Sequence, residues 1–246
     1  MTIKDNFSKQ SAGYSIYRPG YPETLYEFIL SHTPGRKFAL DVATGNGQVA
    51  AVLAEHFEKV FAIDISEKQL KHSINKTNII YSIASAEQTG ITEKVDLVTV
   101  GQAAHWFQLP HFYSEVQRIL RPRGVLALFG YKLPTIDSQV DAVIGEFYDG
   151  LLGPFWDPER KLVDEGYETL HFPFKKMEHP EFQMQSSWTL DQLLGFLGTW
   201  SAVQHYKNKH NADPLDILRE KIAEAWGNTE SKKITFPVFL LATKFD

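Results

Sequence analysis

The pattern from which the fold can be predicted is Phe38-Ala-Leu-Asp-Val-Ala-Thr-Gly-Asn-Gly47. It is an apolar run that ends in an acid, Asp41, and passes into a turn of small residues. The next apolar run, Lys59-Val-Phe-Ala-Ile-Asp64, also ends in an acid. A buried strand, a small-residue turn and an acid after the following strand are typical of a nucleotide-type ligand over the carboxyl end of a parallel sheet. The sequence therefore places Asp64 where the ribose of such a ligand would bind.

The turn after the first strand differs from that of dinucleotide-binding proteins. It reads Asp-x-Ala-x-Gly-x-Gly rather than Gly-x-Gly-x-x-Gly, because Ala43 and Ala50 stand where glycines would be expected. A ligand without a phosphate gains little from an exposed helix N-terminus, whereas its amino group gains from a carboxylate such as Asp41. These residues point away from a dinucleotide pyrophosphate.

The composition is that of one enzyme-sized α/β domain. With 246 residues the chain can bury a substantial core, and one additional lid fits this length. Its formal net charge of -5 argues against a protein that binds nucleic acid through a basic face. The absence of cysteine excludes disulfides, thiolate zinc sites and a cysteine nucleophile, and the histidines lack metal spacing, so we expect no metal. Without an apolar leader or a run of ~20 apolar residues, we expect a cytoplasmic protein with no membrane contact.

Short β-branched and aromatic runs alternate with helical patterns through the first half of the chain. We expect strands near residues 37–42, 59–64, 79–83, 95–100 and 124–130. Apolar residues at helical spacing over 49–57 predict one helix, and the capping-box pattern Ser66-x-x-Gln69 predicts another that continues through Ile74. Pro22 starts a further helix before the first strand. Alternating strands and helices predict a doubly wound sheet.

The alternation breaks after the fifth strand. Apolar residues at helical spacing over 136–151 predict an amphipathic helix that ends at Gly153-Pro154, and residues 154–170 look irregular. We expect this excursion to form a lid over the site. The chain then returns through alternating apolar residues at 178–188, helices near 189–200 and 214–226, and a last strand at 234–243. Pro237 in that strand favours an edge or a bulge.

Several motifs, in this order and spacing, resemble those of class I S-adenosylmethionine (AdoMet) methyltransferases. Asp41 to Gly47 resembles the first AdoMet motif, Asp64 resembles the acid that binds the ribose, and Ala84-Ser-Ala-Glu87 resembles the adenine-binding turn. Residues 96–107 and 119–124 resemble the fourth motif and the turn before the fifth strand. A narrower subgroup, which includes enzymes like trans-aconitate methyltransferase, is similar at residues 7–14, 17–22, 188–190 and 199–203.

The resemblance implies a Rossmann-like, doubly wound α/β sheet of seven strands, mostly parallel with an antiparallel last strand, and a helical lid inserted after strand five. It implies one methyltransferase domain over residues 1–246. Its parts are an N-terminal arm and helix (1–35), a cofactor-binding half (36–130), the lid (131–170) and a C-terminal substrate-side half (171–246). Ala43 replaces the usual first glycine, and Ser85 stands where many relatives carry an adenine-binding aspartate. Ala43 should be tolerable if its φ is negative, and the Ser85 oxygen can still accept from an amino group.

The resemblance also implies the cofactor, AdoMet, and the residues that bind it. These are Tyr14, Asp41, Ala43, Thr44, Gly45, Asp64, Ile65, Ser85, Ala86, Glu87, Gln102 and Ala103. Gln102 follows the fourth strand at the open end of the sheet, where a polar side chain is costly unless it is paired. Without the resemblance, Glu87 fits a solvated turn residue better than a residue that binds the cofactor. Tyr148, Phe155 and Trp156 fit packing of the lid better than a substrate cage.

The chemistry asks little of the side chains, because methyl transfer from a sulfonium is an in-line displacement that depends on positioning. An acceptor carboxylate needs a cationic clamp, for which Arg18, Lys132 and Lys175-Lys176 are candidates; Arg18 is favoured because its fork binds carboxylate at two points. For a hydroxyl or amine acceptor, His105 is the expected base. We therefore name His105 and Arg18 as the catalytic residues, and expect Trp106 to wall the substrate.

The expected function is AdoMet-dependent methylation of a small molecule, with O-methylation of a carboxylic acid as the candidate reaction. A non-catalytic AdoMet-binding protein is one alternative, because the chemistry needs no invariant catalyst. Methylation of a hydroxyl or amine with His105 as the base is another. An NAD-dependent dehydrogenase is disfavoured because the sequence lacks the full glycine fingerprint of such enzymes. A DNA adenine methyltransferase is disfavoured because no Asn/Asp-Pro-Pro-Tyr motif follows the fourth strand. The sequence does not determine the oligomeric state.

Overall fold

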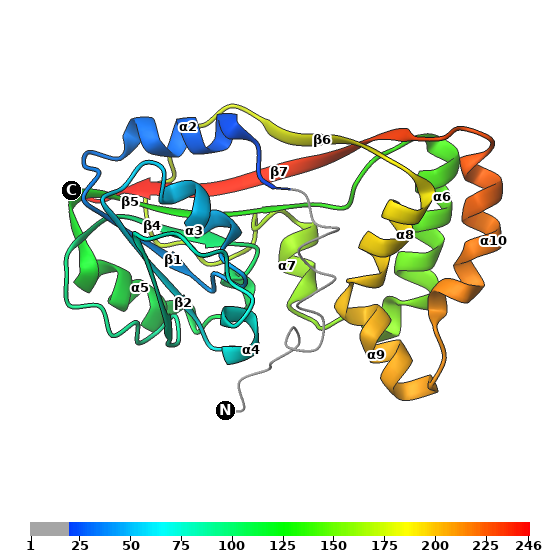
Figure 1. The fold of residues 1–246 in the computed structure, drawn as a ribbon, viewed down its shortest axis with the longest axis horizontal. Coiled ribbons are helices and arrows are strands. Elements are labelled where there is room, and N and C mark those ends of the chain that lie inside the picture. Colours follow the sequence, from blue (N-terminus) through cyan, green and yellow to red (C-terminus); the bar gives the residue numbers. More distant parts are fainter. Residues whose placement is uncertain (1–19) are drawn as a thin grey trace.

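A sheet of seven strands forms the centre of the computed structural model, which describes residues 20–246 (Figure 1). The strand order is β3-β2-β1-β4-β5-β7-β6. The strands are β1 (Phe38–Val42), β2 (Lys59–Asp64), β3 (Ile79–Ile83), β4 (Val95–Gly101), β5 (Leu120–Tyr131), β6 (Phe182–Trp188) and β7 (Lys232–Lys244). Strands β1 to β5 pair in parallel, whereas β7 is antiparallel to both of its neighbours. The predicted doubly wound, mostly parallel sheet with an antiparallel last strand is confirmed.

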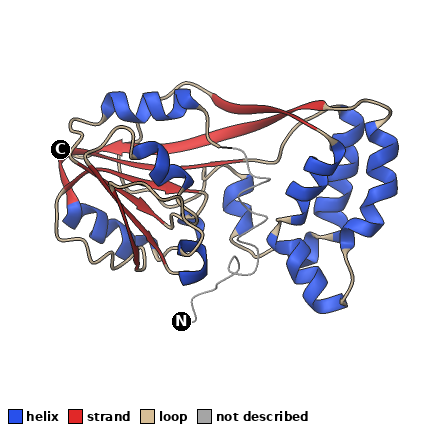
Figure 2. Ribbon diagram, viewed as in Figure 1, coloured by secondary structure: helices blue, strands red, loops and turns tan. Residues whose placement is uncertain are grey.

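Helices cover both faces of the parallel part of the sheet, as Figure 2 shows. Strands β1 and β4 are buried along almost their whole length, which is typical of parallel strands covered on two sides. One core contains Leu25 of α2 (Glu23–His32) and Leu53 of α3 (Gln48–Leu53). A second contains Phe112 and Val116 of α5 (Leu109–Ile119). The two cores fix the carboxyl ends of β1 and β4 as a platform.

Two predicted helices differ from expectation, the first in its length and the second in its hydrogen-bond spacing. The helix capped by Ser66 is only α4 (Glu67–Leu70), because the Ile74 amide donates to the Asn46 carbonyl rather than into the helix. The helix predicted over 136–151 begins as α6 (Ser138–Gly145), with Asp137 as its N-cap, and continues as a π-turn, η2 (Glu146–Leu151). A change in hydrogen-bond spacing leaves little trace in the hydrophobic pattern.

Other helices were not predicted. Residues 154–170 are not irregular throughout, because they include the end of η3 (Gly153–Phe155) and α7 (Arg160–Asp164). A helix as short as α7 has too few residues to show a helical period. The predicted helix at 189–200 is followed by a separate one, α9 (Ser201–His210), which buries only Ala202 and Val203. Within residues 20–246, none of the helices combines the length and apolar character that crossing a bilayer requires.

The segment after β5 divides between two places. Helix α6 packs against α10 (Pro214–Trp226) and, with α8 (Leu190–Gly198) and α9, belongs to a helical group at the far end of β6 and β7 (Figure 1). Helix α7 instead lies beside the sheet and packs against η1 (Ala104–Trp106), the turn that follows β4. Residues 131–170 therefore connect the helical group to the carboxyl end of the sheet, and their action as a lid stays a prediction.

Pro237 does not mark an edge strand, contrary to expectation, because β7 lies between β5 and β6. The Pro237 carbonyl accepts from the Lys132 amide, so the Pro237 nitrogen also faces the side of β7 on which β5 lies. At this position β5 has already ended, because its last paired residue is Tyr131. A proline is tolerated there because the neighbouring strand that would need its N–H has ended.

Candidate functional site

A pocket opens at the carboxyl ends of β1 and β4, the point at which the strand order reverses. Ligands of open α/β sheets bind at this point. The pocket is lined by Tyr21, Asp41, Ala43, Thr44, Gly45, Asn46, Gln48, Val49, Gly101, Gln102 and Tyr131. Its volume is about 80 Å³, whereas pockets for whole ligands usually measure ~300–1,000 Å³. It can therefore hold one end of a larger ligand.

Two tyrosines that were not predicted from the sequence as site residues, Tyr21 and Tyr131, line the pocket. Tyr21 packs its ring edge-on against Phe129, with the centroids 4.7 Å apart, and lies 6.0 Å from the Tyr131 ring. Tyr21 stands directly before α2 and Tyr131 ends β5. In the sequence, both tyrosines lie beside a predicted boundary of a helix or strand, which is the one sign of a site role. Whether their rings come together depends on how α2 crosses the sheet.

The carboxylate of Asp41 is buried, with 1% of the residue exposed. It accepts from the Thr44 hydroxyl at 2.5 Å and from the Thr99 hydroxyl at 2.8 Å. Burial raises the pKa of Asp41 from 3.8 to about 6, despite the lowering effect of the two hydroxyls, and nearby Asp64 raises it further. No cationic side chain within residues 20–246 forms an ion pair with it. A positively charged ligand group would therefore stabilise the ionised form.

The turn between β1 and α3 has a left-handed backbone at Ala43, Gly45 and Gly47, where φ is 54°, 58° and 84°. The condition of a negative φ, under which alanine at position 43 would be free of strain, is therefore not met. The turn is fixed by the Thr44 amide, which donates to the Ile63 carbonyl of β2. A Cβ at Gly47 would collide with the Tyr81 hydroxyl, whereas a Cβ at Gly45 would meet no atom within 4 Å. Gly45 thus leaves open space beside the pocket.

Replacing Ala43 by glycine is expected to stabilise the protein by ~0.5–1 kcal/mol. Alanine in the left-handed region costs roughly 1–2 kcal/mol, and the greater chain entropy of glycine offsets part of the gain. The measurement is the free energy of unfolding in urea. Ala51→Gly, inside α3, is the matched control and should lose a similar amount. A destabilised Ala43→Gly protein would argue against a left-handed Ala43.

Asp64 connects the turn after β1 with the loop after β2. Its carboxylate accepts from the Gly45 amide at 2.9 Å and from the Ser66 amide at 2.8 Å. The two predicted binding acids therefore border one turn, and the charge of Asp64 reaches Asp41. The next residue, Ile65, leaves 41% of its surface exposed. An apolar side chain is thus available beside the pocket.

The turn after β3 lies next to this loop, because the Ala84 amide donates to the Asp64 carbonyl. Ser85 begins a tight turn in which its carbonyl accepts from the Gln88 amide, and Ala86 is buried within it. Glu87 is not simply solvated, because its Oε1 accepts from the Gln108 amide at the start of α5, 2.9 Å away. This contact fixes the turn relative to α5.

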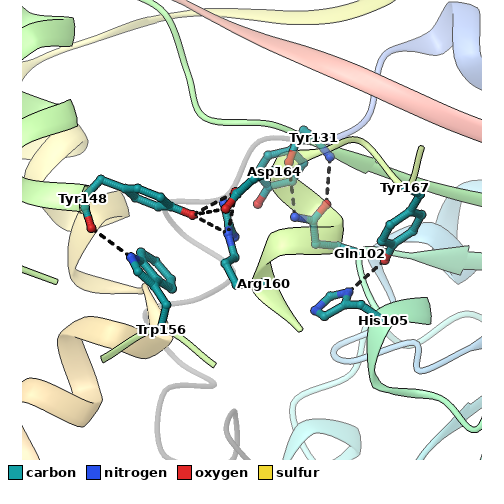
Figure 3. Close-up of polar contacts among 8 residues, drawn as sticks. All are labelled: Gln102, His105, Tyr131, Tyr148, Trp156, Arg160, Asp164 and Tyr167. Atoms are coloured by element: carbon teal, nitrogen blue, oxygen red, sulfur yellow. Dashed lines mark hydrogen bonds and ion pairs between the residues drawn. The ribbon is translucent and has the colours of Figure 1, made fainter. Parts of the chain in front are cut away.

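Gln102 ties the ends of β4 and β5 together (Figure 3). Its Oε1 accepts from the Tyr131 amide at 2.8 Å, and its Nε2 donates to the Tyr131 carbonyl at 3.2 Å. A Cβ at position 130 would collide with this side chain and with the Phe239 ring, so Gly130 provides the room. The side-chain amide of Gln102 is therefore paired with the main chain of β5, while Ala103 is buried directly after it.

His105 lies in η1 and is not among the residues that line the pocket. Its Nδ1 lies 2.9 Å from the hydroxyl of Tyr167, which is fully buried (Figure 3). Burial, and then the charge of Arg160, lower the pKa of His105 from 6.5 to about 3. The imidazole is therefore neutral at physiological pH, and so low a pKa makes it a poor proton acceptor.

A polar cluster that the sequence did not predict lies on α7 and the helices before it (Figure 3). Arg160 Nε donates to the Tyr148 hydroxyl at 2.8 Å and to Asp164 Oδ1 at 3.0 Å. The guanidinium carbon lies 5.6 Å from the ring centroid of Tyr148 and 5.1 Å from that of Trp156. The Tyr148 hydroxyl also contacts both oxygens of Asp164 at 2.8 Å. The predicted packing role of Tyr148 and Trp156 therefore includes holding a cation.

The other predicted cations lie elsewhere. Lys175 and Lys176 precede Met177, whose amide donates to the Ala242 carbonyl of β7, and both lysines are exposed away from the pocket. The side chain of Lys132 lies beneath Gly166. Tyr14 and Arg18, predicted to bind cofactor and substrate, lie outside the residues that the structure describes.

The chain is similar to methyltransferases over most of its length. Residues 40–128 match a family model described as a methyltransferase domain. A Dictyostelium discoideum protein named as a methyltransferase is 32% identical, over 98% of this chain and 95% of that protein. A Saccharomyces cerevisiae protein named as an S-adenosylmethionine-dependent methyltransferase is also 32% identical, over 90% of this chain and 89% of that protein. A solved structure described as a type II methyltransferase from Anaeromyxobacter dehalogenans is 40% identical, with a TM-score of 0.85, and covers 93% of this chain and 98% of that chain.

Proposed function

Because this chain belongs to the class I AdoMet-dependent methyltransferases, we propose that it transfers the methyl group of AdoMet to the carboxylate of a small molecule. One observation carries the cofactor half of the proposal. Asp41 is a buried carboxylate in the pocket where the strand order reverses, and no residue within 20–246 forms an ion pair with it. An ammonium group on the ligand would supply the missing charge.

The pocket fits the amino-acid end of AdoMet. Asp41 would hold the ammonium group, Thr44 keeps the Asp41 carboxylate in place, and Gly45 leaves the space that a Cβ would fill. The turn around Ala43 lacks the glycine pattern that suits a pyrophosphate. When bound there, AdoMet supplies a methyl group activated by its sulfonium charge.

The neighbouring loops fit the nucleoside end. The carboxylate of Asp64, fixed by the Gly45 and Ser66 amides, would accept from the ribose hydroxyls. The exposed Ile65 and the buried Ala86 would border the adenine, with Ser85, Glu87 and Ala103 beside them. Gln102, paired with Tyr131, would act by shaping the pocket wall.

The weak basicity of His105 supports an acceptor that is already ionised. A protonated amine or a hydroxyl would need a base, and the pKa of His105 is lowered to about 3. A carboxylate needs none, because holding it in line with the methyl–sulfur bond supplies much of the acceleration. The alternative function, methylation of a hydroxyl or amine with His105 as base, is thereby disfavoured.

The organisation of the chain is part of the same proposal. Residues 36–130 bind the cofactor, and residues 131–170 with 171–246 enclose a small-molecule substrate as parts of one domain. Helix α7 supports this arrangement, because it packs against η1 at the carboxyl end of the sheet. The net charge of -5 supports a substrate other than nucleic acid.

The experiment is transfer of a tritium-labelled methyl group from AdoMet into a pool of cell metabolites. We expect labelled acids whose label is released by mild alkali, as for a methyl ester. Calorimetry should show binding of AdoMet and S-adenosylhomocysteine, and none of NAD. Alkali-stable label in amines or ethers would favour the alternative acceptor, and the absence of any labelled product would contradict the proposal.

A further inference from the structure

The contact between Tyr167 and His105 bears on which nitrogen of His105 carries its hydrogen. Burial raises the pKa of Tyr167, so its hydroxyl keeps its proton. Within residues 20–246, the side-chain partner of that hydroxyl is His105 Nδ1, 2.9 Å away. Donation of the Tyr167 proton to Nδ1 leaves that nitrogen without a hydrogen of its own. A neutral imidazole that accepts at Nδ1 carries its hydrogen on Nε2.

The Nε2–H group of His105 is a donor that the described part of the chain does not use. Within residues 20–246, His105 makes its side-chain hydrogen bond through Nδ1 alone. In Figure 3 the imidazole extends from η1 with Nδ1 toward Tyr167 and its other end toward the side on which Arg160 lies. The second nitrogen is therefore directed toward the region between η1 and α7.

Arg160 carries further unused donors. Its Nε is bonded to Tyr148 and Asp164, whereas its two Nη groups make no hydrogen bond to any residue of the described range 20–246. The rings of Tyr148 and Trp156 hold the guanidinium plane, which limits its motion. Helix α7 packs directly against η1, and the charge of Arg160 is close enough to lower the pKa of His105. Two elements thus bring donors to one region, where the Asp164 carboxylate engages Arg160 through Nε and leaves its Nη groups available.

We propose that His105 and Arg160 together bind the anionic group of the methyl acceptor, with His105 donating through Nε2–H and Arg160 through its Nη groups. His105 then acts as a hydrogen-bond donor rather than as a base. The inference rests on the proposed function and names the residues that select its substrate. One carboxylate oxygen is held while the other attacks the methyl carbon. The new C–O bond forms as the S–CH₃ bond breaks, its electron pair passes to sulfur, and no proton moves.

The first test needs no substrate. Nitrogen-15 spectra of the histidine rings, with His105 assigned by its absence in His105→Gln, report both the protonation state and the tautomer. We expect His105 to remain neutral with hydrogen on Nε2 from pH 5 to pH 8, in the free protein and with S-adenosylhomocysteine bound. An imidazole that takes up a proton in this range, or that carries its hydrogen on Nδ1, would overturn the inference even if methyl transfer is observed.

The second test compares variants in the tritium-transfer assay with the metabolite pool. Arg160→Gln should lower kcat/KM for the labelled acid roughly 10- to 150-fold, the loss expected for hydrogen bonds to a charged group, and leave the affinity for S-adenosylhomocysteine unchanged. Arg160→Lys should recover part of the loss. Lys161→Gln, at the next and mostly exposed position, is the control and should behave as wild type. If Arg160→Gln retains wild-type kcat/KM, the inference is wrong; if the wild-type protein labels nothing, the proposed function has failed first.

Discussion

Replacing Asp41 by asparagine is expected to weaken AdoMet binding at least ~30-fold and, at the same time, to make the ligand-free protein more stable at pH 7.5. Removing one member of a buried ion pair costs ~2–5 kcal/mol of binding free energy, and each 1.4 kcal/mol is tenfold in affinity. The same change removes a buried charge that forms no ion pair with any residue of the described range 20–246. Function and stability should therefore move in opposite directions.

The gain in stability follows from the raised pKa of Asp41. The pKa in the folded protein is about 6, compared with 3.8 for an unperturbed group, so the native state binds this proton more tightly. The stabilising contribution of the proton is complete below pH 3.8 and is lost as the pH rises through 6. At pH 7.5 the ionised side chain therefore costs on the order of 1–3 kcal/mol. Asparagine avoids that cost and can still bond to Thr44 and Thr99.

Asp96 provides a matched control, because its replacement by asparagine should lower the stability of the protein rather than raise it. It is also buried, with 2% exposed, but its carboxylate accepts from the Lys37 and Phe38 amides and pairs with Arg121 at 3.1 Å. Asp96→Asn should lose ~1.5–3 kcal/mol of stability and keep its affinity for AdoMet. Urea unfolding at pH 7.5 and calorimetry distinguish the two variants. Wild-type affinity in Asp41→Asn would remove Asp41 from the cofactor site.

Gly130→Ala is expected to destabilise the protein by ~2–4 kcal/mol, although alanine is otherwise better suited than glycine to a strand. The added Cβ would collide with Gln102 Oε1 and with the buried Phe239 ring. Overpacking of this kind costs ~1–3 kcal/mol, and displacing Gln102 breaks its two bonds to Tyr131. Because Gln102 and Tyr131 line the pocket, the affinity for AdoMet should fall with the stability.

The measurement is the free energy of unfolding in urea together with the calorimetric affinity. Gly145→Ala is the control, because a Cβ at this helical position meets no atom within 4 Å and alanine favours a helix by ~1 kcal/mol. It should be neutral or stabilising. A Gly130→Ala protein as stable as wild type would show that the Gln102 side chain is not held against Gly130.

The sheet could be predicted from the sequence because each parallel strand is a short apolar run with its own boundary signal. The strand β2 was placed at Lys59–Asp64 from the pattern alone. Asp41 and Asp64 could be placed at one edge for the same reason, since the carboxyl ends of neighbouring parallel strands meet there. The parallel strands and the two acids at their ends therefore followed from local sequence.

The rest of the site depends on contacts between distant residues. His105 looks like a base in the sequence, and it becomes a poor one through burial near Tyr167, a residue 62 positions away. Arg160 lies in a five-residue helix without a detectable period, and the aromatic side chains that hold it come from the preceding turns. The left-handed φ of Ala43 is imposed by the bond from Thr44 to β2.

The binding mode of the cofactor can be determined from a crystal structure of the protein with S-adenosylhomocysteine. We expect the ammonium group of the ligand within hydrogen-bond distance of the Asp41 carboxylate, the ribose hydroxyls on Asp64, and the adenine beside Ile65 and Ala86. We also expect the ligand sulfur to face the region between η1 and α7. A ligand bound away from the ends of β1 and β4, or one whose ammonium group makes no contact with Asp41, would contradict the account.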